Sequence, residues 1–246
     1  MNKSWLAALT LGLGLPAAAA PDAAPATQPD VAVHSYILLD RTGSMSGIWG
    51  EALSSVNAYA TSIGEAEAGD ADIKTEISLA VFDAQEGLQF DVLRRSVGAE
   101  DWAEVTDAEA APRGMTPLYD AIGRLVSLAE ADGPEKAVLV IMTDGLENAS
   151  REMTGDGAKA ALDRARERGW EVVFLGAEFA NFSDADAVGV SGQKSIAVGS
   201  GRFSSTMSNL AKKSRDYAQE PEAEIVFDAE DRAASGEEDV KDRTGQ

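Results

Sequence analysis

Residues 31–46 read VAVHSYILLDRTGSMS, an apolar run that passes directly into a polar loop. The first nine residues are mostly apolar at both alternating sets of positions, which is typical of a central parallel strand covered on both faces. Asp40, Thr42 and Ser44 follow at alternate positions, and apolar residues at helical spacing begin at Trp49. We therefore expect a buried strand, a loop rich in oxygen donors and a helix, in that order.

The alternation of strands and helices continues along the chain. Residues 87–94 follow the strand-like run 73–82 after a gap too short for a crossover helix, so these two strands should form an antiparallel hairpin. The other connections are long enough for right-handed crossovers through helices. Further apolar runs lie at 136–142 and 171–176, and helical spacings at 49–63, 118–129, 158–168 and 203–217. The predicted fold class is α/β: a doubly wound, mostly parallel six-stranded sheet with one antiparallel edge strand and helices on both faces, as in Rossmann-like folds.

Composition limits the chemistry that this chain can perform. Its 246 residues include 42 acidic and 21 basic residues, for a formal net charge of −21, so it has no basic surface that could drive nucleic-acid binding. The absence of cysteine excludes disulfides, thiolate zinc sites and cysteine nucleophiles, and His34 is the only histidine. Any bound metal should therefore be a hard cation held by carboxylate and hydroxyl oxygens.

The two ends of the chain differ from its middle. Lys3, a short apolar stretch and a run of alanines predict a secretory signal peptide over residues 1–20, with residues 21–30 as a linker. A disordered leader or a retained anchor is the alternative. Residues 31–218 form the predicted folded domain. Residues 219–246 are strongly acidic with one apolar cluster, and we expect them to form a disordered, solvated tail.

Five oxygen-bearing side chains fall where a metal site would be expected in this fold. Asp40, Thr42 and Ser44 follow the first strand, Thr116 precedes Pro117 at the start of a helix, and Asp144 follows the strand at 136–142. Each alone could be a turn or helix-capping residue. Ligands of open α/β sheets bind outside the carboxyl ends of the strands, so we expect the five side chains to surround one cation.

The same segments resemble a known family. The stretches DRTGSMS, GMTPLYDAI and TDGLENAS are similar to the metal-ion-dependent adhesion site of von Willebrand factor A domains, and the resemblance covers about residues 31–218. It implies that Asp40, Thr42, Ser44, Thr116 and Asp144 are the metal ligands, with Thr42 at a position where the family more often has serine. It further implies a divalent cation, Mg²⁺ before Mn²⁺ or Ca²⁺, completed by an Asp or Glu carboxylate of a protein partner.

The leading hypothesis is a non-enzymatic, metal-dependent protein-binding or adhesion module that is periplasmic or secreted, with no membrane span in the mature chain. One alternative is a Mg²⁺-dependent hydrolase such as a phosphatase, although Thr42 stands where an aspartyl-phosphate enzyme would want a second aspartate. In a third hypothesis the cation mainly holds the loops together. If the leader is not cleaved, an intracellular accessory role beside an ATPase or in a stress response becomes the better hypothesis.

Neighbouring polar residues have open roles. Asp83 could orient a metal-bound water, but the first position of the hairpin turn is the favoured interpretation. Glu147 and Asn148 could fix their loop or contact a partner. The long segment 96–115, with a short helical piece at 101–105, should overhang the site. We expect structural roles for Asp120, His34 and Trp49.

Overall fold

The computed structural model describes residues 31–65, 73–177, 183–220 and 222–244. The predicted signal peptide and linker lie outside the described residues. From Val31 onward the chain forms one compact unit, and no helix within the described ranges is long and apolar enough to cross a membrane.

The core of the fold is a six-stranded sheet with the strand order β3-β2-β1-β4-β5-β6. All neighbouring strands are parallel except β2 and β3, which form the predicted antiparallel hairpin at the sheet edge. This arrangement confirms the predicted fold class. The strands are β1 (Val31–Asp40), β2 (Lys74–Ala84), β3 (Leu88–Gly98), β4 (Ala137–Thr143), β5 (Glu171–Ala177) and β6 (Ser195–Val198).

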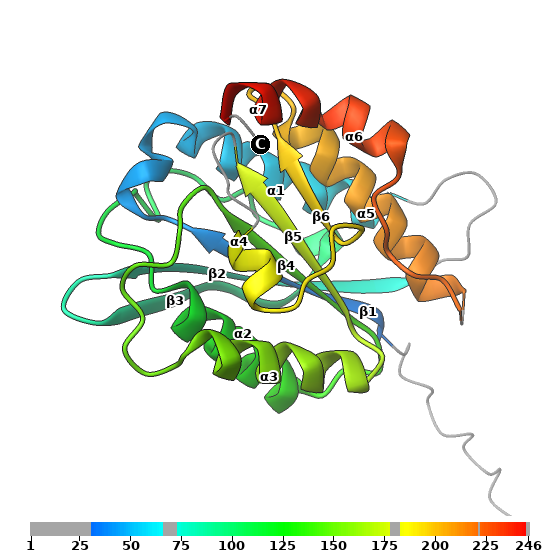
Figure 1. Cartoon of the computed structure of the whole chain (residues 1–246). Helices are drawn as coiled ribbons and strands as arrows, with labels where there is room; N and C mark the ends of the chain where they lie inside the picture. The colour runs from blue at the N-terminus through cyan, green and yellow to red at the C-terminus, as the bar shows by residue number, and fades with distance from the viewer. Residues whose placement is uncertain (1–30, 66–72, 178–182, 221, 245–246) are drawn as a thin grey trace, which may run out of the picture. The chain divides into compact units, whose positions relative to one another are not determined.

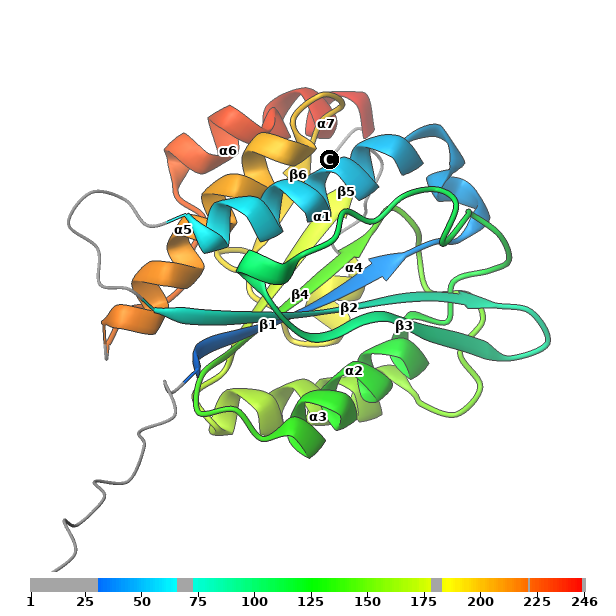
Figure 2. The ribbon, with the colours of Figure 1, turned by 180° about the vertical axis from the view of Figure 1, so that it is seen from behind.

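Helices cover both faces of the sheet (Figures 1 and 2). One face is covered mainly by α1 (Trp49–Gly64) and α5 (Phe203–Gln219), and the other by α2 (Leu118–Asp132) and α3 (Gly155–Glu167). The short α4 (Ser183–Ala187) belongs to the second face, and 3-10 turns lie at Gly43–Gly47 (η1) and Ala99–Asp101 (η2).

Strand β1 is buried on both faces because its alternate residues enter two separate cores. Ile37 and Leu39 pack with α1 and α5, whereas Tyr36 and Leu38 pack with α2 and α3. His34 is 3% exposed on this central strand, so it is a core residue. The continuous apolar run in β1 therefore reflects double coverage.

Two expectations about secondary structure need refinement. The sixth strand, β6, contains only four residues, Ser195–Val198, too few for a clear sequence pattern. The helical piece expected at 101–105 is instead the 3-10 turn η2 at Ala99–Asp101.

The prediction of a disordered tail over residues 219–246 is wrong for most of that segment. It contains α6 (Ala229–Ser235) and α7 (Glu237–Thr244), and Ile225, Phe227 and Val240 are buried. Several of its acidic residues make hydrogen bonds or ion pairs within the segment. Asp228 and Asp231 form a capping box, and the Glu237 carboxylate pairs with Arg232 and Lys241. The high net charge of the segment is therefore compatible with folding, because caps and ion pairs offset it and three apolar side chains anchor it.

Candidate metal centre

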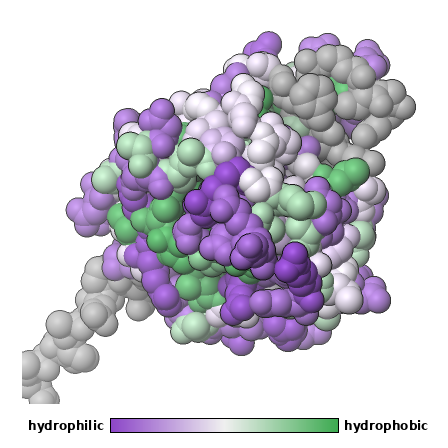
Figure 3. All heavy atoms as spheres, turned by 90° about the vertical axis from the view of Figure 1, so that its left-hand side faces the viewer, coloured by the Kyte–Doolittle hydropathy of each residue, from purple (hydrophilic) through white to green (hydrophobic). Residues whose placement is uncertain are grey.

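Four of the five predicted ligands lie at or just beyond the carboxyl ends of two adjacent strands. Strands β1 and β4 are parallel neighbours in register, with Leu39 beside Met142, so Asp40 at the end of β1 lies near Asp144 just beyond β4. The parallel strands point toward the left and top of Figure 1. Figure 3 shows the left-hand face, which is largely hydrophilic with separate apolar areas.

A chain of hydrogen bonds joins four of the five predicted ligands. The Thr42 amide donates to Oδ1 of Asp40 at 2.7 Å, and the Thr42 and Ser44 hydroxyl oxygens lie 3.1 Å apart. The Ser44 hydroxyl then donates to Oδ1 of Asp144 at 2.7 Å. Thr143, which sequence reasoning missed, donates its hydroxyl to the second Asp40 oxygen at 2.5 Å. Thr143 directly precedes Asp144 at the strand end, and that position was the only sequence signal available for it.

Gly145 shows that Thr116 belongs to the same cluster. A Cβ atom at Gly145 would lie 3.1 Å from the Thr116 hydroxyl oxygen and 3.6 Å from that of Ser44. Helix α2 is capped by Pro117 without a side-chain hydrogen bond, so Thr116 does not act as its N-cap. The structure therefore brings the five predicted residues into one cluster, in which hydrogen bonds connect four and Gly145 lies close to the fifth, Thr116.

The site concentrates negative charge at low exposure. Asp40 is fully buried, and burial is the main reason that its pKa is raised to about 6, with a contribution from the nearby Asp144 and an opposing one from its hydrogen bonds. Burial also raises the pKa of Asp144, while the Ser44 hydrogen bond opposes this shift. Two such carboxylates beside three hydroxyls are a donor set suited to a hard divalent cation, whose charge would favour their ionised forms.

The chemistry of this donor set differs from that of a carboxylate cage. Within the described ranges no group of three or more His, Asp or Glu side chains is placed to hold a metal ion. The candidate centre relies instead on the hydroxyls of Thr42, Ser44 and Thr116. A site with few charged ligands suits Mg²⁺, which retains several waters and uses one or two carboxylates.

A cluster of ion pairs around the buried Arg41 and Asp83 adjoins the loop that carries Thr42 and Ser44. Arg41 is 4% exposed, and its guanidinium pairs with Asp83 at 2.5 Å and with Asp91 at 2.6 Å. Arg113 also donates to Asp83, at 3.2 Å. Asp83 lies inside β2, with the hairpin turn beginning after it, so the favoured interpretation of Asp83 as the first turn residue is wrong. Its second oxygen, Oδ1, is buried without a hydrogen-bond partner among the residues described.

The backbone ties the second loop to the first. The Arg113 amide donates to the Arg41 carbonyl at 2.8 Å, and the Gly43 amide donates to the Gly114 carbonyl at 3.2 Å. Gly114 has a φ of 72°, and a Cβ atom there would lie 2.5 Å from the Ala84 carbonyl oxygen. Glycine is therefore required at this position by both conformation and space. These contacts fix the segment that carries Thr116.

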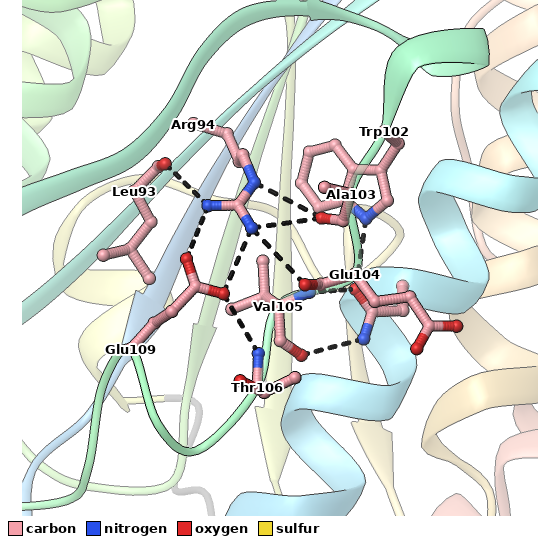
Figure 4. Close-up of polar contacts among 9 residues, drawn as sticks. Leu93, Arg94, Trp102, Ala103, Glu104, Val105, Thr106 and Glu109 are labelled. Atoms are coloured by element: carbon pink, nitrogen blue, oxygen red, sulfur yellow. Dashed lines mark hydrogen bonds and ion pairs between the residues drawn. The ribbon is translucent and has the colours of Figure 1, made fainter.

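Only the end of the long segment 96–115 reaches the site. Its middle part lies along α1, where Asn57 accepts from the Trp102 indole and the Val105 amide. Figure 4 shows the Arg94 guanidinium donating to the Ala103 and Glu104 carbonyls and to the Glu109 carboxylate. The expectation that the whole segment overhangs the metal centre is therefore wrong, because these contacts hold residues 102–109 against α1 and β3. Trp49 donates its indole N–H to the Ala110 carbonyl and packs in the core, as expected.

The third loop is held by its own polar residues. The Glu147 carboxylate accepts from the amides of Tyr119, Ala149 and Ser150. Asn148 accepts from the Thr116 amide at 2.9 Å, and the Asp120 carboxylate accepts from the three amides of residues 151–153. Glu147, Asn148 and Asp120 thus fix the loops around the site.

Three other residues that support the site were missed from the sequence. Asp184 accepts from the Glu147 amide at 2.8 Å, and Arg41 and Arg113 anchor the first two loops. Arg41 could have been noticed, because it stands between two predicted ligands. Asp184 carries no such signal.

Comparison with known proteins identifies the fold. No family model and no curated protein matches the sequence. Among solved structures, the open conformation of the pilus adhesin SpaC from Lactobacillus rhamnosus GG matches with a TM-score of 0.60 and 15% identity, over 75% of this chain and 30% of the adhesin. The vWF domain of a type V pili tip protein from Porphyromonas gingivalis matches with a TM-score of 0.54 and 11% identity, over 78% of this chain and 97% of that domain.

A von Willebrand factor type A structure from Catenulispora acidiphila matches with a TM-score of 0.51 and 14% identity, over 74% of this chain and 42% of that one. The chain thus spans less than a third of the adhesin and less than half of the Catenulispora protein. The motifs found in the sequence, the strand order and these matches agree. The chain has the fold of von Willebrand factor A domains.

Proposed function

We propose that this protein is a cation-dependent protein-binding module whose metal centre is formed by Asp40, Thr42, Ser44, Thr116 and Asp144. The observation that carries the proposal is the grouping of these five side chains from three loops that are far apart in the sequence. Hydrogen bonds connect four of them, and the fifth, Thr116, lies close to Gly145. Mg²⁺ is the cation that the donor set favours, with Mn²⁺ and Ca²⁺ as alternatives.

Asp40 and Ser44 differ in exposure, and their proposed roles differ accordingly. Asp40 is fully buried, so it supplies negative charge from below and cannot contact a partner. Ser44 is exposed, so we expect the open side of the centre to lie near its hydroxyl. The bound cation would supply a positive centre for an incoming carboxylate. An Asp or Glu of a protein partner is therefore the group we expect to complete the site.

The geometry favours binding over hydrolysis. Both carboxylate oxygens of Asp40 accept internal hydrogen bonds, from the Thr42 amide and the Thr143 hydroxyl, and the side chain is buried. A carboxylate held in this way is poorly placed to attack a phosphate ester. We therefore propose a non-enzymatic role.

The location that we propose is outside the cytoplasm, in the periplasm or secreted. Two of the structural neighbours are a pilus adhesin and a pilus tip domain, which supports a role in adhesion at a surface. The signal-like residues 1–20 point the same way. Sequencing the N-terminus of the protein from separated cell fractions tests this. A full-length chain in the cytoplasm would favour the intracellular accessory role.

Isothermal titration of the purified protein with MgCl2, MnCl2 and CaCl2 tests the metal centre. We expect saturable binding of one cation, weakened at least about tenfold in Asp40→Asn, Thr116→Val and Asp144→Asn, because each removes a charge or a hydroxyl from the donor set. Asp107→Asn is the matched control, since Asp107 is an exposed turn residue outside the five proposed ligands. Equal affinity in all four variants would place the cation elsewhere and overturn the proposal.

A further inference from the structure

Two exposed apolar side chains lie beside the candidate metal centre. In the part of the chain that the structure describes, four large apolar side chains are exposed, and two of them are Met115, at 54%, and Leu146, at 49%. Met115 directly precedes Thr116, and Leu146 directly follows Gly145. A Cβ atom at Gly145 would lie 3.1 Å from the Thr116 hydroxyl oxygen, so each apolar residue is the chain neighbour of one of two residues that lie close together. The other two exposed apolar residues, Val92 and Val226, are not chain neighbours of Gly145 or of a proposed ligand.

Hydrogen bonds hold the backbone at or beside both residues. The Met115 amide and carbonyl both pair with Ala84, at 3.2 and 2.9 Å. On either side of Leu146, the Gly145 amide donates to the Thr143 hydroxyl and the Glu147 amide donates to Asp184. Little backbone freedom is left to lose on binding, so apolar contacts here would contribute to affinity with a small entropic cost.

The local charge limits the kind of partner that fits. The centre contains two carboxylates that one divalent cation would offset, and the whole chain carries a formal charge of −21. A partner segment with several adjacent acidic groups would be repelled by carboxylates within the screening length of roughly 8 Å. A single carboxylate between apolar side chains avoids that repulsion and covers the two exposed residues.

We propose that Met115 and Leu146 determine specificity, and that the partner presents one Asp or Glu flanked by apolar side chains. This inference rests on the proposed function, because the carboxylate is the group that completes the metal centre. The apolar neighbours add selectivity that the cation alone does not provide, since a cation accepts any accessible carboxylate.

Binding of capped synthetic peptides to the full-length protein in saturating MgCl2 tests the proposal, with fluorescence polarisation as the readout. The peptides share a scaffold and differ at the centre: Leu-Asp-Leu, Ser-Asp-Ser, Asp-Asp-Asp and Leu-Asn-Leu. We expect Leu-Asp-Leu to bind most tightly, roughly tenfold better than Ser-Asp-Ser, which is the effect of burying two apolar side chains in part. Leu-Asn-Leu should not bind, and EDTA should abolish binding of every peptide.

The variants Met115→Ser and Leu146→Ser should each reduce the preference for Leu-Asp-Leu over Ser-Asp-Ser about threefold or more, because each removes one apolar contact. Val92→Ser is the matched control, since Val92 is an exposed apolar residue on β3, and it should leave the preference unchanged. Equal affinity for Leu-Asp-Leu and Ser-Asp-Ser in MgCl2 would overturn this inference and leave the proposed function standing. Binding that is indifferent to both EDTA and the Asp-to-Asn change would overturn both.

Discussion

The Ser44 hydroxyl donates a 2.7 Å hydrogen bond to Oδ1 of Asp144, although the two residues are separated by 100 positions in the sequence. Ser44 lies in the turn after β1 and Asp144 just beyond β4, so the contact exists only because these strands are adjacent and parallel. It joins the first and third loops directly. The site therefore depends on the strand order of the sheet. Substitutions in the loops that form the site and in the residues that support them test this arrangement.

The first prediction concerns repulsion within the metal-free site. Asp144→Asn removes one of two neighbouring carboxylates but keeps an oxygen that can accept from Ser44. In EDTA we expect the variant to melt at the same temperature as the wild type or higher. The wild type should gain about 2.7 kcal/mol from magnesium at a concentration 100 times its dissociation constant, and the variant much less. Thermal melting in EDTA and in MgCl2 measures both effects. A full magnesium gain in the variant would contradict the assignment of Asp144.

The second prediction concerns Arg41. Arg41→Ala leaves Asp83 fully buried, with the half-exposed Arg113 as its remaining ion-pair partner. Breaking a buried ion pair by removing one partner costs about 3 kcal/mol or more in the free energy of unfolding. Urea denaturation in EDTA checks this. Arg124→Ala, in the exposed pair with Glu152, is the control and should change stability by less than about 1 kcal/mol. Similar losses of unfolding free energy in both variants would show that the ion pairs of Arg41 stabilise the protein no more than an exposed pair does.

The third prediction separates conformation from close packing at Gly114. Gly114 and Gly201 have nearly the same φ, 72° and 74°, but a Cβ atom at Gly114 meets the Ala84 carbonyl whereas one at Gly201 meets nothing within 4 Å. Gly201→Ala should therefore show only the left-handed backbone penalty of about 1 kcal/mol. Gly114→Ala should cost clearly more and should also weaken magnesium binding, because the loop carrying Thr116 must shift. Equal losses of unfolding free energy for Gly114→Ala and Gly201→Ala, measured by urea denaturation, would show that the loop at Gly114 adjusts to the added Cβ atom without further cost.

The fourth prediction concerns pH. His34 is buried against Ser78 and Tyr36, and burial lowers its pKa to about 4, although Glu76 and Asp132 act to raise it and Arg95 to lower it. Between pH 6.5 and about 4 the unfolded chain binds a proton at this histidine that the folded chain does not. The free energy of unfolding should therefore fall as pH decreases through this interval, by about 3 kcal/mol from His34.

Comparison of the wild type with His34→Gln isolates this contribution. Asp40, whose pKa is raised, acts in the opposite direction in metal-free protein, and it cancels in the difference between the two proteins. We expect the stability advantage of the wild type to decrease steadily from neutral pH to pH 4 in urea denaturation. A difference that does not change with pH would show that His34 titrates normally in the folded protein.

The fifth prediction concerns the C-terminal segment. Phe227 is buried in the core shared by α1 and α5, and its amide donates to the Gln193 carbonyl. Phe227→Ala should cost about 3 kcal/mol in the free energy of unfolding through the cavity that it leaves. Val226→Ala, at the neighbouring exposed position, should cost less than about 1 kcal/mol. Equal small effects would instead support the expectation from composition that this segment is a disordered, solvated tail.

Much of the fold could be predicted because it depends on local patterns. The apolar run of β1 and the similar runs of β4 and β5 are visible without neighbours, and the short gap before β3 leaves only a hairpin. The four residues of β6 are too few to show a period. The prediction for residues 219–246 is wrong because composition averages over the segment and does not show that Phe227 and Val240 become buried.

By itself, the sequence determined which oxygen-bearing residues stand at the ends of strands and which chemistry they can support, because residue type and position along a strand are local properties. Only the tertiary structure decided that Ser44 meets Asp144 and that Asp83 pairs with Arg41 and Arg113. It alone also decided that Met115 and Leu146 remain exposed beside the centre. Those relations depend on which strands become neighbours and on which surfaces are covered, and both are settled by packing between distant parts of the chain.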